Sequence, residues 1–205
     1  MGLLKKQFIY TVEEYLAIEA SSAERHEYLD GEIVAMAGES PAHAKMSSNL
    51  HVLLGSQLWD RPCDVLSKDT KIRSGPDSRG RRVYAGMFSY PDLAVVCGEW
   101  LFVDENSHVV VNPTVLIEVL SPSTEEFDRG EKAARYRLWN RTLRDYLLVS
   151  QDRPRIEHCC RDEAGEWASI EHLGMETVVA LPSIGCSLKL ADVYHRVQFT
   201  PEGVE

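Results

Sequence analysis

The chain has 205 residues, of which 44% are hydrophobic and 26% are charged, and its formal net charge at pH 7 is −10. These values are typical of a soluble globular protein, and they exclude a protein that coats nucleic acid through overall positive charge, although a local basic patch is compatible with them. The length suits one domain over residues 1–205 with a core at about 40–150, because no Gly/Ser linker divides the chain.

The ends and the cysteines of the chain bear on its compartment. No apolar stretch approaches membrane-spanning length, and the first ten residues, MGLLKKQFIY, lack the apolar core of a secretory signal. We therefore predict a cytoplasmic protein without a membrane partner. The cysteines are odd in number and irregularly spaced, so we expect buried or half-buried thiols rather than a disulfide framework. They are Cys63, Cys97, Cys159, Cys160 and Cys186.

The first predicted elements are a short helix and a hairpin. The sequence TVEE at 11–14 matches a capping box, which predicts a helix to about residue 20. The segment HEYLDGEIVAM then predicts a β-hairpin around Asp30-Gly31, a pair that favours a type I′ turn. In that register Glu27 lies opposite Val34, so its carboxylate shares a face with an apolar residue.

A second helix and four core strands follow. Leucines and a methionine at helical spacing predict a helix that opens at Ser40 and runs to Trp59. A further helix starts near Asp128, after the third strand, and the segments RIEHCCR and EWASIEHL read as a peripheral antiparallel pair. The core order of helix, three strands, helix and strand predicts an α/β fold with a mixed sheet. The core strands are predicted at 63–74, 90–98, 113–120 and 145–150.

Two carboxylates lie where this sheet is predicted. Glu118 interrupts the apolar run PTVLIEVL, and a buried unpaired carboxylate costs several kcal/mol, so it should have a partner, be protonated or face a cleft. Asp92 begins the preceding strand, and the two side chains can converge if the strands are adjacent. Two such groups repel unless a cation intervenes, and Mg²⁺ or Mn²⁺ suits oxygen ligands of this kind. Either residue alone is also compatible with turn chemistry or a buried arginine pair.

Five segments in this order, over about residues 10–160, carry a resemblance: HEYLDGEIV, YPDLAVV, NPTVLIEVLSPST, DRGEKAARY and DYLLV. They resemble the putative restriction endonuclease-like branch of the PD-(D/E)XK nuclease superfamily. The resemblance implies a restriction-type endonuclease that hydrolyses DNA phosphodiester bonds, in which Asp92 and Glu118 hold Mg²⁺. It also favours a homodimer, since cutting two strands with one site per chain suits two-fold symmetry.

The chain departs from the family pattern at one position. The usual pattern places a lysine two residues after the strand glutamate, and Leu120 occupies that position here. Such a lysine stabilises the charge of the transition state. We expect Lys132, near the start of the following helix, to supply the missing ammonium, with Lys71 as the alternative.

Glu27 and His43 have alternative assignments. Glu27 matches the branch's EY-x-x-G segment and is predicted to bind metal or orient its water, or else to pair with Arg25 or Arg129. For His43, a helix-capping or solvent-facing imidazole is expected rather than a place in the cleft.

Two questions of function stay open at this point. The sequence SRGRRVY carries Arg79, Arg81 and Arg82, and is either a solvated loop or a phosphate contact. The alternatives to a nuclease are a non-catalytic nucleic-acid or protein-binding module on the same fold, and a hydrolase of another phosphoester.

Overall fold

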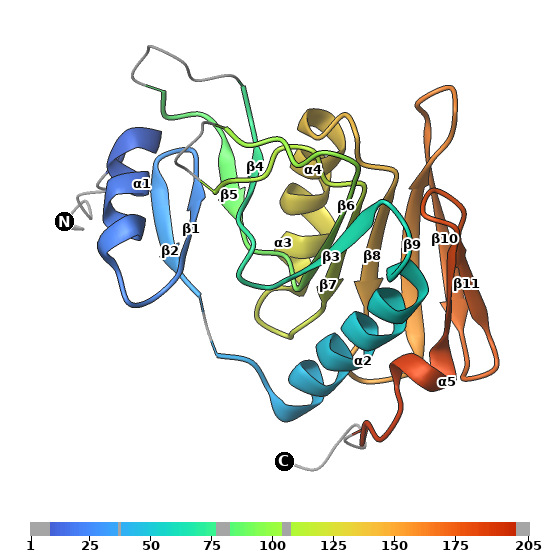
Figure 1. Cartoon of the computed structure of the whole chain (residues 1–205). Coiled ribbons are helices and arrows are strands. Elements are labelled where there is room, and N and C mark those ends of the chain that lie inside the picture. Colours follow the sequence, from blue (N-terminus) through green and yellow to red (C-terminus); the bar gives the residue numbers. More distant parts are fainter. Residues whose placement is uncertain (1–8, 37, 77–82, 104–107, 200–205) are drawn as a thin grey trace.

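The structure is a computed structural model that describes residues 9–36, 38–76, 83–103 and 108–199 (Figure 1). Arg79, Arg81 and Arg82 lie outside the described residues. The helices are α1 (Val12–Ser21), α2 (Pro41–Leu58), α3 (Glu125–Phe127), α4 (Ala133–Trp139) and α5 (Leu190–Val193), with a π-helical turn η1 (Asp128–Lys132) between α3 and α4. The strands are β1 (His26–Leu29), β2 (Glu32–Ala35), β3 (Cys63–Ser67), β4 (Ile72–Ser74), β5 (Met87–Ser89), β6 (Leu93–Cys97), β7 (Val115–Val119), β8 (Asp145–Val149), β9 (Arg155–Arg161), β10 (Trp167–Leu173), β11 (Val178–Leu181) and β12 (Cys186–Lys189).

A six-stranded mixed sheet in the order β10-β9-β8-β7-β6-β3 forms the centre of the fold. The pair β7 and β8 is parallel, and the other neighbours in this sheet are antiparallel. The segment α3-η1-α4 connects the parallel pair, as a parallel connection requires a crossover. The predicted α/β fold with a mixed sheet is therefore confirmed.

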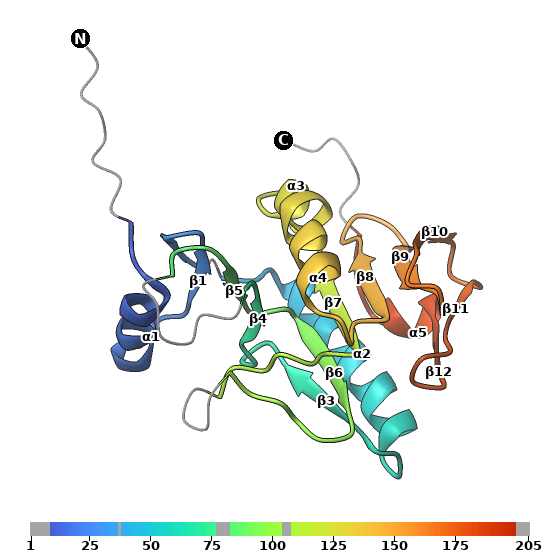
Figure 2. The ribbon, with the colours of Figure 1, turned by 90° about the horizontal axis from the view of Figure 1, so that it is seen from above.

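The two faces of this sheet carry separate apolar cores. On one face of the sheet, the leucines of α2 pack against every second side chain of β6 and β7. The intervening side chains of these strands lie on the other face and pack against α4. Figure 2 shows α2 and α4 on opposite sides of these strands. Strand alternation decides which side chains of β7 face which helix. Leu116 and Leu120 lie on the α4 side, so Glu118, between them, faces that side too.

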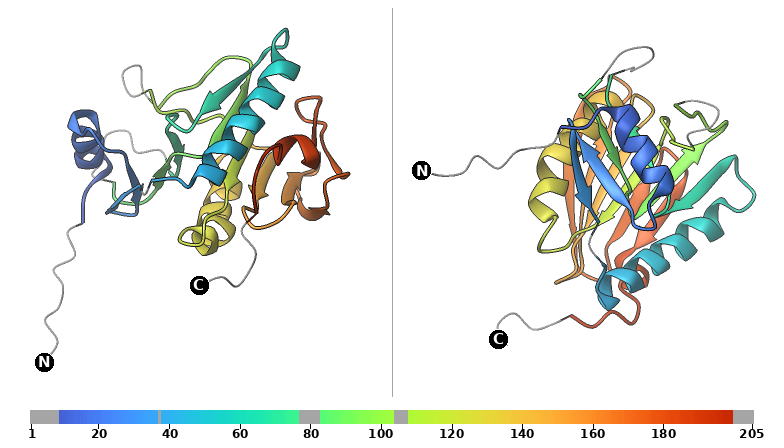
Figure 3. Two further views of the ribbon diagram at one scale, coloured as in Figure 1. Left: turned by 90° about the horizontal axis from the view of Figure 1, so that it is seen from below. Right: turned by 90° about the vertical axis from the view of Figure 1, so that its left-hand side faces the viewer.

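The N-terminal hairpin agrees with the sequence prediction. Asp30 and Gly31 have φ values of 46° and 102°, the left-handed pair that a type I′ turn requires, and Glu27 lies opposite Val34. The hairpin joins a second sheet, in the order β2-β1-β5-β4, which is capped by α1 through the buried ring of Tyr15. Figure 3 shows α1 and this hairpin to one side of the six-stranded sheet.

Two predicted strands are wrong in extent. The segment 63–74 is divided between the two sheets, because a turn closed by the hydrogen bond from Thr70 N to Ser67 O (2.9 Å) separates β3 from β4. The strand predicted at 90–98 begins only at Leu93, as β6. The strand before it, β5, belongs to the four-stranded sheet. Between β3 and β6 the chain thus crosses between these two sheets twice, and Asp92 lies at the second of these crossings.

The expectation that every cysteine is a free thiol is wrong for one pair. Cys63 and Cys97 form a disulfide, and Cys159, Cys160 and Cys186 are free. The physical reason is strand register, since Cys63 and Cys97 lie directly opposite each other on β3 and β6. The crosslink closes a loop with a sequence separation of 34 residues.

Removal of this disulfide is expected to destabilise the fold. Replacing Cys63 and Cys97 together by serine should lower the free energy of unfolding by about 2–4 kcal/mol, since the crosslink restricts the unfolded chain. Urea denaturation of the variant and the unmutated protein, without reductant, measures the change. Cys160→Ser, which alters a free thiol, is the matched control. Equal unfolding free energies for the double variant and the unmutated protein would contradict the assignment.

Within the described part of the chain, no helix has the length and apolar character needed to span a membrane.

Candidate active site

Glu118 lies within the buried strand β7, and its carboxylate has two partners. Its side chain is 5% exposed, Lys132 Nζ lies 2.9 Å from its Oε1, and the hydroxyl of Tyr136 donates to the same oxygen at 3.2 Å. Burial raises the pKa of the Glu118 carboxyl well above its ordinary value; Lys132 opposes that shift, and nearby carboxylates add to it. The site therefore favours a positive charge beside this carboxylate.

Lys132 supplies the positive charge among three carboxylates. Its Nζ lies 2.9 Å from Glu118, 3.2 Å from Glu27 and 3.3 Å from Asp128, and its side chain is 6% exposed. Burial alone would lower the pKa of Lys132, but these carboxylates and Tyr136 outweigh it and raise that pKa well above the ordinary value. Lys132 therefore stays protonated at the end of η1, where Asp128, one turn earlier, shares its side of the helix.

The second sequence-predicted glutamate comes from the other sheet. Glu27, on β1, accepts a hydrogen bond from Tyr90 N at 3.1 Å and contacts Lys132 at 3.2 Å. Because Glu27 and Glu118 contact the same ammonium, they lie inside the roughly 8 Å within which a metal or its water can bridge them. The partners proposed as alternatives for Glu27 are wrong. Arg25 pairs instead with Asp69, and Arg129 pairs with Glu125 and Glu157.

Asp92 lies beside Glu118, just before the first residue of β6. The pairing of Leu93 with Ile117 places Asp92 next to the end of β7, and Val119 N donates to its Oδ2 at 2.7 Å. Its other oxygen, Oδ1, lies 2.7 Å from Nε2 of His43, on the first turn of α2. Asp92 thus joins two groups, since it neighbours Glu118 on one side and His43 on the other.

The expectation for His43 is wrong. The imidazole lines the cleft with its side chain 12% exposed, and the side-chain amide of Gln151 lies 3.2 Å from its Nδ1. The capping role belongs to Ser40, whose hydroxyl accepts from His43 N at 3.1 Å. The register of α2 on the sheet directs the imidazole inward, and the helical pattern of the sequence does not fix that register.

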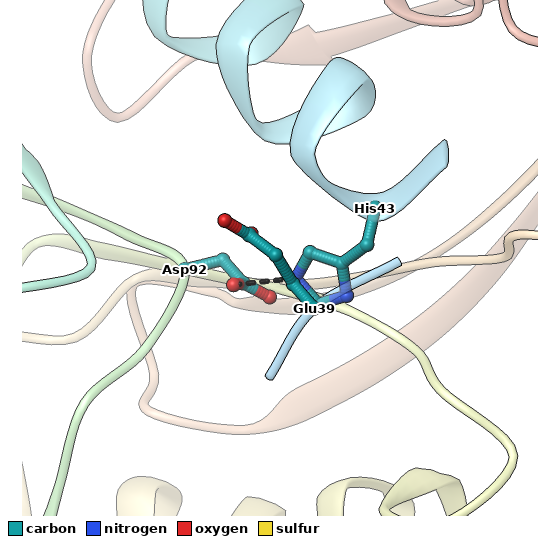
Figure 4. A group of neighbouring side chains, drawn as sticks. All are labelled: Glu39, His43 and Asp92. Carbon is teal, nitrogen blue, oxygen red and sulfur yellow. Dashed lines mark hydrogen bonds and ion pairs between the residues drawn. The ribbon is translucent and has the colours of Figure 1, made fainter. Parts of the chain in front are cut away.

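A further carboxylate, which the sequence prediction did not include, completes a cluster. Glu39, His43 and Asp92 each offer a ligand atom, and these atoms lie within 4.8 Å of one another (Figure 4). Glu39 is exposed and also pairs with Lys68. The sequence signal was the spacing of Glu39 and His43 across the start of α2, which brings both to one end of the helix.

These side chains line one cleft of about 1030 Å³ between the two sheets and the start of α2. Its lining includes Glu27, Glu39, His43, Asp92, Glu118, Asp128 and Lys132. Lys71, the alternative source of an ammonium, does not line it. It lies over the rings of Tyr15 and Tyr90, with its Nζ 4.0 Å from Glu19. Of the two lysines, the structure therefore brings only Lys132 to Glu118.

Comparisons with known proteins bear on the family and the fold. The uncharacterized proteins slr1290 and sll1609 of Synechocystis sp. are 34% and 32% identical to this chain, over 91% and 81% of its length and 92% and 89% of theirs. The fold resembles that of a putative nuclease belonging to DUF820 from Anabaena variabilis. That match has a TM-score of 0.70 and 16% identity, and covers 90% of this chain and 97% of the other. A family model described as Uma2, putative restriction endonuclease, matches residues 12–191. The chain therefore belongs to the Uma2 family of putative restriction endonucleases.

Proposed function

We propose that this protein is a Mg²⁺-dependent endonuclease that hydrolyses phosphodiester bonds in DNA. The observation that carries the proposal is the contact of Lys132 with Glu118, in a cleft where Asp92 lies at the neighbouring strand. A buried ammonium beside clustered carboxylates matches the charge pattern needed at a phosphate that gains negative charge. The family match supports this reading.

The donor set of the cleft fits a divalent metal ion. Carboxylate oxygens dominate it, and Glu27, Asp92, Glu118 and Asp128 outnumber the one buried ammonium of Lys132. Hard oxygen ligands in excess of positive charge suit Mg²⁺ or Mn²⁺. Asp92 and Glu118 would hold the ion. A bound ion there would activate a water molecule and offset charge on the scissile phosphate.

An alternative donor set shares Asp92. His43 and Glu39 approach it from α2, and an imidazole with two carboxylates is compatible with Mn²⁺ as well as with softer ions. The two sets differ in which carboxylate accompanies Asp92, and the metal titration described in the Discussion separates them.

The remaining side chains orient the groups that react. Tyr136 and Lys132 fix the Glu118 carboxylate through its Oε1, and Val119 N fixes one oxygen of Asp92. The Lys132 ammonium is positioned to neutralise charge on a phosphate oxygen that enters the cleft. Glu27 is held by Tyr90 N through its Oε1, and its Oε2, which has no hydrogen bond or ion pair with the described residues, can accept a proton from an attacking water. We also propose that the active form is a homodimer, in which two such clefts cut the two strands.

The proposal is tested by incubating the protein with supercoiled plasmid DNA. Mg²⁺ or Mn²⁺ should convert the plasmid to nicked and linear forms, and EDTA should prevent the conversion. Asp92→Asn is the matched control, since it keeps the size of the side chain and removes the charge. If the unmutated protein cuts neither DNA nor RNA with any divalent ion, the protein is instead a non-catalytic binding module. Cleavage of a small phosphodiester but no polynucleotide would indicate a different phosphoesterase.

A further inference from the structure

A second groove lies at the end of the six-stranded sheet opposite the cleft. Its volume is about 520 Å³, and it lies between the loop that follows α4 and the turn that joins β9 to β10. In Figure 1 both segments are at the top, whereas α3 lies below α4 near mid-height and the start of α2, which borders the cleft, is at the bottom. The groove is lined by Leu138, Arg141, Arg144, Arg161, Glu163, Ala164 and Gly165.

Three arginines give this groove a charge that contrasts with the rest of the protein. Among the described residues, Arg141, Arg144 and Arg161 form no ion pair with a carboxylate, although the chain has a net charge of −10. Arg141 and Arg144 are exposed, and Glu163 is the one acidic residue in the lining. Three guanidinium groups without a carboxylate partner, gathered around one hollow, form a surface suited to an anion.

Backbone carbonyls, rather than acidic side chains, hold two of these guanidinium groups in place. Arg161 donates from Nε to Gly165 O at 3.1 Å and from Nη1 to Arg141 O at 3.2 Å. Arg144 donates from Nη1 to Asp162 O at 3.4 Å. These bonds orient the guanidinium groups without cancelling their charge, so their remaining N–H groups can donate to a ligand.

The turn between β9 and β10 is built around Arg161. Gly165 has a φ of +90°, a backbone conformation that residues with a side chain rarely adopt. A Cβ at this position would lie 3.3 Å from Arg161 Nη2. The guanidinium also lies over the ring of Trp167, 6.0 Å from its centroid. Arg161 therefore has a fixed position before any ligand arrives, and the entropic cost of binding there is reduced.

We propose that this groove binds the phosphate groups of a nucleic-acid backbone at a distance from the cleft. The identity of the ligand rests on the proposed function, whereas its anionic character rests on the groove alone. Arg144 directly precedes β8, and Leu148 of that strand pairs with Glu118, so the two sites are separated by roughly 13 Å of strand. One duplex can span that distance, and its backbone would then be held at two places while the cleft engages one phosphodiester.

The groove is tested by measuring DNA binding without cleavage. Fluorescence anisotropy with a labelled short duplex in EDTA, at several salt concentrations, gives the affinity and its salt dependence. Replacing Arg141 and Arg144 together by glutamine should weaken binding and reduce the slope of log K against log salt by about 2, one unit for each lost phosphate contact. Glu163→Gln should strengthen binding, because it removes the competing carboxylate.

The matched control removes the same charge elsewhere. Lys45 and Lys189 are lysines outside both the groove and the cleft, and Lys45→Gln with Lys189→Gln should leave the slope nearly unchanged. Equal effects of the two double variants would overturn the proposal, since the arginines would then act only through net charge.

Inorganic pyrophosphate, titrated by calorimetry, distinguishes the source of the phosphate. If the Arg141 and Arg144 double variant loses pyrophosphate binding but binds the duplex as the unmutated protein does, the groove takes a small anion, and the nucleic-acid assignment is overturned. Duplex binding that depends on the groove, in a protein that cuts nothing, would support the groove and refute the nuclease.

Discussion

Replacing Lys132 by alanine is expected to slow plasmid nicking on the order of 10²- to 10³-fold, equivalent to about 3 to 4 kcal/mol of transition-state stabilisation. The ammonium lies 2.9 Å from Glu118 in a nearly buried site, where loss of a positive charge is poorly compensated by water. Nicking rates under saturating Mg²⁺ measure the effect. Lys71→Ala is the control, since Lys71 is also partly buried but contacts Tyr15 and Glu19 instead.

The same substitution should also affect stability. Without Lys132, the carboxylates of Glu27, Glu118 and Asp128 face each other without their shared cation, and breaking a buried ion pair costs about 3–5 kcal/mol. Mg²⁺ should therefore raise the unfolding temperature of the Lys132→Ala variant more than that of the unmutated protein. Rates must be compared at a temperature where circular dichroism shows both proteins folded. If folded Lys132→Ala nicks at the unmutated rate while Lys71→Ala does not, the ammonium has been assigned to the wrong lysine.

Neutralising Asp92 or Glu118 is expected to weaken Mn²⁺ binding at least tenfold, about 1.4 kcal/mol. Asp92→Asn and Glu118→Gln keep the shape of the side chains and remove the charges that attract the ion. Folding should persist in both variants, because fewer like charges remain in the cleft and Lys132 keeps Glu27 and Asp128 as partners when Glu118 is neutralised. Calorimetric titration with Mn²⁺ gives the affinities directly, independently of any cleavage.

Two further variants identify the second ligand. If Asp92 and Glu118 form the site, then His43→Ala and Glu39→Gln should change the Mn²⁺ affinity by less than a factor of about 3. A tenfold loss in these two variants, together with an unchanged Glu118→Gln, would transfer the site to Glu39, His43 and Asp92. Binding that no one of the four substitutions weakens would show that the cleft does not hold the ion.

The parts of the fold that the sequence predicted are those fixed by local pattern. A capping box at Thr11, the Asp30-Gly31 turn and the apolar run around Glu118 each determine structure over a few residues, and each appears in the structure. The crossover helix between β7 and β8 followed from the same logic, because a parallel pair needs one.

The parts that the sequence did not predict depend on how distant segments meet. The turn at residues 68–70 contains neither glycine nor proline, the strongest turn signals, so only the polar segment SKDT marked the division of the predicted strand at 63–74. The disulfide depends on the register of β3 against β6, which places Cys63 opposite Cys97. The inward direction of His43 likewise depends on where α2 contacts the sheet.

The position of Leu120 has a consequence for how such proteins are found in genomes. Leu120 is 3% exposed and belongs to the apolar core under α4, so a lysine there would have to leave that core to reach solvent. The ammonium beside Glu118 comes instead from Lys132 on η1, whose Nζ lies 2.9 Å from the Glu118 Oε1. A pattern search with a fixed interval between the strand glutamate and the lysine rejects this chain. A search for an ammonium near the carboxylate in three dimensions retains it. Surveys based on the linear motif therefore undercount chains with this arrangement.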